Sequence, residues 1–168
     1  MIEVSCYYSL SSPWAYFAGP RQQDIVRRHH VKLLLKPYDF QAVVPKTGGV
    51  PLRTRPESRR SYHALELERW RNFLGMPLEL APKHYPADGK PDGWNKPAGW
   101  MVIAAQEARL DAPRLSHALL RALWAEERNT ADPAVRREIA FENEMDGDAL
   151  TSALRVRLVA GEDTRPHR

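Results

Sequence analysis

The sequence is poor in cysteine: Cys6 is the one thiol in 168 residues. This excludes an internal disulfide framework and a zinc site made of four thiolates. Long apolar runs are lacking too, since the run over 100–105 falls far short of the roughly 20 residues that a membrane span needs. No basic region precedes the short N-terminal apolar run, which argues against a secretory signal. We therefore expect a cytoplasmic protein with no membrane partner.

A strong excess of charge is also missing. The chain has 25 Lys and Arg against 21 Asp and Glu, which gives a formal net charge of +4. Basic residues do cluster at Arg53, Arg55, Arg59 and Arg60, but acidic residues are spread through the rest, and no nucleic-acid-binding motif is present. We expect no nucleic-acid partner. The basic cluster is more simply a solvated loop, which could attract a small anion.

The first 38 residues have the pattern of a βαβ unit. Residues 2–8 mix apolar, β-branched and aromatic side chains over the length of a strand. Pro13 suits the first turn of a helix, which continues to about residue 29 and ends in basic residues. Residues 31–38 then form a short apolar run that predicts a second, largely buried strand. The handedness of such units predicts two parallel strands with the helix across one face.

After this unit the pattern is mostly helical. Proline and glycine make 39–56 and 81–97 irregular, and helices are predicted over 65–74, 98–109, 113–127, 133–143 and 147–158. Two parallel strands are too few for a stable sheet, so either helices cover both edges or sheet partners come from elsewhere. The prediction is an α/β chain with an N-terminal βαβ half at 1–56, a helical insertion at 57–158 and a disordered polar tail at 159–168.

The most informative site is Ser12-Pro-Trp-Ala, at the junction of the first strand and helix. The amides and dipole of a helix N-terminus favour negative charge there. Thioredoxin-like proteins of the DsbA type place Cys-Pro-x-Cys at this junction, where the helix lowers the pKa of the first thiol. Ser12 and Ala15 replace both cysteines, so this motif cannot perform dithiol exchange. Ser12 also suits a purely structural role as a helix N-cap.

A Ser-Pro at that junction resembles the branch of the family that uses glutathione: kappa-class glutathione transferases and 2-hydroxychromene-2-carboxylate isomerases. Further blocks are similar to the isomerase branch and extend the resemblance over roughly 1–155: Ser12–Ala18, Gly48–Leu52, Leu67–Trp70, Leu74–Pro77, Leu120–Asn129 and Ala131–Val135. The resemblance implies a thioredoxin-like fold of the DsbA and kappa type with a large helical insertion. It also implies C-terminal strands and a closing helix, which this sequence does not show, so we expect a C-terminally truncated chain.

The resemblance implies a glutathione-dependent cis/trans isomerase in the degradation of aromatic compounds, acting on a small aromatic carboxylate. Ser12 would be the catalytic residue and would donate a hydrogen bond to the sulfur of glutathione, which makes glutathione the expected cofactor. Trp14, Gln41, Arg59 and Asn95 are the expected glutathione-binding residues, although Trp14 equally suits packing and Asn95 equally suits helix capping. No metal site is expected, because the histidines lack ligand spacing.

Two other functions stay open at this point. A related transferase would share the thiolate site and release a glutathione adduct, and an inactive truncated helical module would bind a partner instead. Relatives are commonly dimers, and an exposed sheet edge favours self-association, so we expect a homodimer. Cys6, within the first strand, is expected to be a small core residue.

Overall fold

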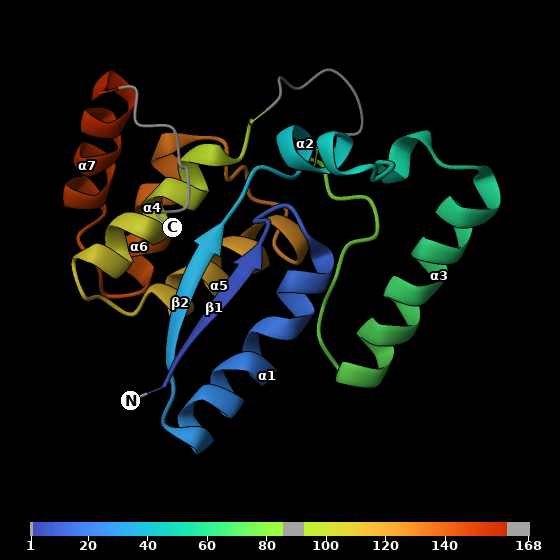
Figure 1. The fold of residues 1–168 in the computed structure, drawn as a ribbon, viewed down its shortest axis with the longest axis horizontal. Coiled ribbons are helices and arrows are strands. Elements are labelled where there is room, and N and C mark those ends of the chain that lie inside the picture. Colours follow the sequence, from blue (N-terminus) through green and yellow to red (C-terminus); the bar gives the residue numbers. More distant parts are fainter. Residues whose placement is uncertain (1, 86–92, 161–168) are drawn as a thin grey trace.

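The computed structural model describes residues 2–85 and 93–160 (Figure 1). None of the helices in these residues is long and apolar enough to cross a membrane. In chain order the elements are β1 (Glu3–Tyr8), α1 (Pro13–His29), β2 (Lys32–Pro37), α2 (Phe40–Val43), η1 (Val44–Thr47), η2 (Leu52–Thr54), α3 (Glu57–Leu74), α4 (Lys96–Glu107), α5 (Ala112–Trp124), α6 (Pro133–Glu142) and α7 (Gly147–Ala160).

The predicted βαβ unit is present. β1 and β2 pair in parallel, with Glu3 opposite Lys32 and Tyr8 opposite Pro37. Ser12 is the N-cap of α1 and Pro13 occupies its first turn, where the missing amide of proline costs nothing. The helix ends at His30, whose left-handed backbone (φ 50°) turns the chain directly into β2.

The two edges of the sheet differ. On the outer edge of β2, the side-chain amide of Gln106 in α4 pairs with the backbone of Leu35 through both its oxygen and its nitrogen. Within the described residues no strand lies along the outer edge of β1 (Figure 1). A helix therefore covers the edge of β2, as one of the two expected solutions requires, whereas β1 has no second neighbouring strand among the described residues.

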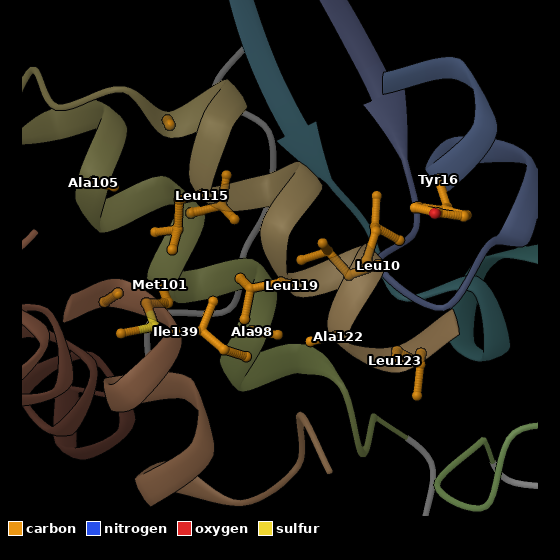
Figure 2. Close-up of a cluster of buried hydrophobic side chains, with 14 of the residues drawn as sticks. Leu10, Tyr16, Ala98, Met101, Ala105, Leu115, Leu119, Ala122, Leu123 and Ile139 are labelled. Atoms are coloured by element: carbon orange, nitrogen blue, oxygen red, sulfur yellow. The ribbon is translucent and has the colours of Figure 1, made fainter. Parts of the chain in front are cut away.

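The core lies between α4, α5 and α6 and continues into the βαβ unit. Met101, Leu115, Leu119 and Ile139 are almost completely buried and gather between the three helices (Figure 2). Leu10 and Tyr16 belong to the same cluster, so buried side chains from both sides of residue 56 form one core. The apolar face of α5 therefore anchors the βαβ unit, which positions the start of α1 beside the helical segment.

Several predicted segments differ from the structure in kind or extent. The segment 39–56, expected to be irregular, contains the short helices α2, η1 and η2. α3 begins at Glu57, eight residues before the apolar pattern that predicted it, because its first two turns are exposed and polar and give no periodic signal. α7 extends to Ala160, so 159–160 are helical, whereas the rest of the predicted tail lies outside the described residues.

Candidate functional site

A cavity of about 610 Å³ opens where β1 ends and α1 begins. Its walls come from β1, α1, the segment after β2, the start of α3 and α5. Its volume falls in the range of about 300–1,000 Å³ that is typical of ligand sites. The described lining residues include Arg53 and Arg60 but no Asp or Glu. The cavity is therefore suited to an anionic ligand.

Ser12 lines this cavity and caps α1 at the same time. Its Oγ accepts a hydrogen bond from the amide of Ala15 at 3.3 Å. Within the described residues no acceptor takes the hydroxyl hydrogen of Ser12, so this O–H can donate to a ligand while the oxygen caps the helix. The capping role and the ligand role, which the sequence left as alternatives, are therefore compatible.

Trp14 follows one residue into α1 and also lines the cavity. It is 37% exposed, and its ring makes edge contacts with Phe17 at 6.2 Å and with His63 of α3 at 5.6 Å between ring centroids. Burial, and to a lesser extent the charge of Arg55, lower the pKa of His63 below its ordinary value of 6.5. Trp14 therefore packs α1 against α3 and presents part of its surface to the cavity.

Gln41 lines the cavity from α2. This four-residue helix is held by Asp39, whose Oδ1 accepts from the amides of Gln41 at 3.0 Å and Ala42 at 3.3 Å. The other carboxylate oxygen of Asp39 lies 3.4 Å from Nζ of Lys96 at the start of α4. The N-cap and the ion pair made by Asp39 therefore hold α2 in place, and α2 in turn positions Gln41 beside the cavity.

Arg59 does not line the cavity, although we expected it to contact glutathione; Arg53 and Arg60 do. The reason is helical geometry: adjacent residues of α3 point about 100° apart, so Arg60 faces the cavity when Arg59 does not. Arg60 forms an ion pair with Glu57 in the same helix, whereas Arg53 has no ion pair with any described residue. Two cations near position 59, Arg53 and Arg60, therefore line the cavity in its place.

Asn95 is likewise outside the large cavity. It is 7% exposed at the start of α4 and borders a separate space of about 20 Å³. Its backbone oxygen accepts from the amides of Ala98 and Gly99, but its side chain makes no capping hydrogen bond. Asn95 therefore borders a small space between the end of β2 and the start of α4, and not the cavity beside Ser12.

The cavity contains a polar cluster that sequence reasoning missed. Ser116 and His117 of α5 line it, and Ser116 Oγ lies 2.6 Å from the hydroxyl of Tyr8 in β1. Burial is the main reason why the pKa of Tyr8 lies well above its ordinary value. His117 stacks on Tyr16 at 5.4 Å, and its Nδ1 is buried without a hydrogen-bond partner in the described structure. The feature of the sequence that could have revealed this cluster is the pair Ser116-His117 on the buried face of an amphipathic helix.

Cys6 is half-buried: it packs against the hydrophobic core, as expected of a small core residue, and it also lines the cavity. Its side chain shares one face of β1 with Tyr8, which follows from the two-residue period of a strand. This thiol lies on a strand and not at the first turn of α1, where the DsbA-type motif would place it.

The sequence matches the family model of the DSBA-like thioredoxin domain over residues 3–162. The chain belongs to this family. Solved structures with the same fold include a 2-hydroxychromene-2-carboxylate isomerase, with 19% identity over 95% of this chain and 74% of that chain and a TM-score of 0.73. The cytosolic disulfide reductase DsbM from Pseudomonas aeruginosa has 18% identity over 93% and 70% and a TM-score of 0.65. No curated protein matches the sequence.

DsbM has also been solved with GSH, at 17% identity to this chain, 93% and 71% coverage and a TM-score of 0.65. Such low identities show the fold alone. The DSBA-like fold is mixed α/β, mostly helical with a small sheet, as observed here. In this DSBA-like domain the strand-to-helix junction presents a hydroxyl instead of a thiol, and Ala15 lines the cavity where a second cysteine would stand. The arrangement can bind and orient a thiolate but holds no dithiol.

Proposed function

We propose that this chain is a glutathione-dependent cis/trans isomerase that acts on a small aromatic carboxylate of the 2-hydroxychromene-2-carboxylate type. The observation that carries the proposal is the Ser12 hydroxyl, which has a free hydrogen at the start of α1 and borders a cavity of ligand size. A helix N-terminus and a hydroxyl donor both favour a sulfur anion. The fold shared with an isomerase of this type and with a reductase solved with GSH supports the same choice.

The lining residues fit glutathione, an anionic tripeptide at neutral pH, because the described lining of the cavity includes cations and no acid. Ser12 would donate to the sulfur, Trp14 would pack against the ligand and Gln41 would hydrogen-bond to its backbone. When bound, glutathione supplies a thiolate that adds reversibly to a conjugated carbon, so that a double bond becomes a single bond that rotates before the sulfur leaves. Arg53, which has no ion pair in the described structure, is the residue we assign to the substrate carboxylate.

Titration calorimetry with glutathione tests the site, with Ser12→Asp as the decisive variant. Aspartate keeps the helix cap but replaces the donor with a negative charge, so the fold should persist while affinity falls at least tenfold. Ser152→Ala, on an exposed turn of α7 away from the cavity, is the matched control and should bind like the parent chain. Unchanged binding by Ser12→Asp would contradict the proposal.

Product analysis then separates the isomerase from the kappa-like transferase, which would use the same thiolate. An isomerase returns glutathione unchanged after many turnovers, whereas a transferase consumes one molecule for each adduct. The proposal expects conversion of the aromatic carboxylate with constant free thiol. If a folded sample binds glutathione and consumes it, the result supports the glutathione site and contradicts the isomerase assignment.

A further inference from the structure

Two hydroxyl groups meet at one wall of the large cavity. Tyr8 is the last residue of β1, and Ser116 lies near the start of α5. Their hydroxyl oxygens are 2.6 Å apart, and both residues line the cavity. A hydrogen bond between two hydroxyls uses one of their two hydrogens, whichever residue donates. The pair therefore keeps one O–H that can donate to a ligand and oxygen lone pairs that can accept from it.

The wall that carries this hydroxyl pair is uncharged. Among the described residues, β1 and α5 contribute no Asp, Glu, Lys or Arg to the cavity. Burial lowers the pKa of His117, which also lines this wall, and raises the pKa of Tyr8, so both side chains are uncharged at neutral pH. The arginines that line the cavity in the described structure, Arg53 and Arg60, belong to η2 and α3. A carboxylate at the hydroxyl pair would therefore lose its water without gaining a cation, whereas an uncharged polar group would not pay this cost.

Apolar surface lies beside the hydroxyl pair. Leu120 follows Ser116 by one turn of α5. Leu35 is paired in register with Cys6, two residues before Tyr8. Both leucines line the cavity and are almost completely buried. Between its first turn and Gln22, α1 contributes only small side chains to the described lining: Ala15, Ala18 and Gly19. Apolar walls and small side chains leave room for a flat aromatic ring next to the two hydroxyls.

We propose that the Tyr8–Ser116 pair is the part of the candidate site that recognises a hydroxyl group on the aromatic ring of the substrate. The pair donates its remaining hydrogen to the aryl hydroxyl and accepts the hydrogen of that hydroxyl. A phenol both donates and accepts, so it satisfies the pair completely, whereas a carboxylate only accepts and is better placed at Arg53. The inference rests on the proposed function for the class of substrate. It makes Tyr8 and Ser116 specificity-determining residues, which take no part in the addition of the thiolate.

Two ligands that differ in a single hydroxyl test the inference on the unaltered full chain. trans-2-Hydroxycinnamate and trans-cinnamate share an aromatic ring and a carboxylate, and only the first carries a phenolic hydroxyl. We expect titration calorimetry to show that trans-2-hydroxycinnamate binds at least tenfold more tightly, because a site that hydrogen-bonds a ligand hydroxyl discriminates against a ligand that lacks it. This comparison needs no variant, so it decides the question even if a substitution at the pair prevents folding.

A double variant then assigns the preference to these two residues. Tyr8→Phe with Ser116→Ala removes both hydroxyls together, so neither is left without a partner, and circular dichroism checks that the fold persists. Its affinity for trans-cinnamate should stay close to that of the parent chain, and its affinity for trans-2-hydroxycinnamate should fall to the same level. Tyr62→Phe with Ser152→Ala is the matched control. It makes the same chemical changes on exposed residues of α3 and α7 that do not line the cavity, so it should keep the tenfold preference.

Glutathione titration separates this inference from the proposed function. The Tyr8→Phe, Ser116→Ala variant should bind glutathione like the parent chain, because the sulfur lies at Ser12. A parent chain that prefers trans-2-hydroxycinnamate but does not bind glutathione would support the hydroxyl subsite and contradict the glutathione-dependent function. Equal affinity of the parent chain for the two cinnamates would overturn the inference, even where glutathione binds. A folded parent chain that binds neither cinnamate, or a double variant that keeps the preference, would overturn it as well.

Discussion

The side-chain amide of Gln106 forms the two hydrogen bonds with the backbone of Leu35 that a neighbouring strand would otherwise form. Its Oε1 accepts from the Leu35 amide at 2.8 Å, and its Nε2 donates to the Leu35 oxygen at 3.5 Å. Leu35 is 4% exposed, so without this amide two backbone groups would be buried without partners. One residue of α4 therefore joins the helical segment to the βαβ unit and closes one edge of the sheet, which has two strands in the described part of the chain.

Replacing Gln106 by methionine should lower the free energy of unfolding by about 1–3 kcal/mol, because the side chain keeps its length but leaves the Leu35 amide unsatisfied. Chemical denaturation monitored by circular dichroism measures this change. Gln106→Glu keeps an acceptor for the shorter of the two bonds and should lose less. Equal losses in both variants would mean that packing, and not the hydrogen bond to Leu35, is responsible.

The fold was predictable from sequence wherever local patterns decide it. The strand-helix-strand unit follows from the apolar run before Ser12, from Pro13 and from the basic end of α1. The contact between Gln106 and Leu35 was not predictable, because a single glutamine near the end of a helical pattern looks the same whether it faces solvent or a strand 71 residues away. Only the packing of α4 on β2 distinguishes these cases.

Gly19 should be intolerant of any side chain, because a Cβ there would lie 2.5 Å from Nδ1 of His117. We expect Gly19→Ala to destabilise the chain by about 1–3 kcal/mol, as overpacking of a core does. The double variant Gly19→Ala, His117→Ala should be more stable than the sum of the single effects, because removing the imidazole makes room for the methyl group. If urea denaturation shows that the losses in the free energy of unfolding are additive, alanine at position 19 destabilises the chain for a reason other than its contact with His117.

The candidate site was only partly predictable. The position of Ser12 follows from its place at a strand-to-helix junction, and the cavity is lined by Ser12, Trp14 and Gln41. Arg59 and Asn95 lie outside this cavity, because their orientation depends on the phase of α3 and α4, which the pattern of the preceding loops does not fix. His117 was not predicted as a site residue because the histidines were considered only as metal ligands. Its position in the cavity depends on the packing of α1 against α5, which the sequence pattern does not give.

Stability should decrease below about pH 6.5 through His117. Burial, and secondarily the charge of Arg121, lower the pKa of His117 from its ordinary 6.5. Between the two pKa values the unfolded chain binds the extra proton and the folded chain does not, so stability rises with pH through this window and levels off above it. His117→Phe keeps an aromatic ring on Tyr16 but cannot titrate, so urea denaturation from pH 5 to 8 should show a smaller slope. His63 also has a lowered pKa, and His63→Phe should reduce the remaining slope.

Asp39 and Asp146 offer a matched pair for separating helix capping from ligand binding. Each accepts two backbone amides through one carboxylate oxygen, at 3.0 and 3.3 Å for Asp39 and at 3.0 and 2.9 Å for Asp146. Loss of a cap costs about 0.5–2 kcal/mol, so both alanine variants should be destabilised. Only Asp39 holds the helix that carries Gln41 to the cavity. Asp39→Ala should therefore weaken glutathione binding in calorimetry severalfold, whereas Asp146→Ala should not. Equal affinities in the two variants would show that α2 does not position a ligand contact.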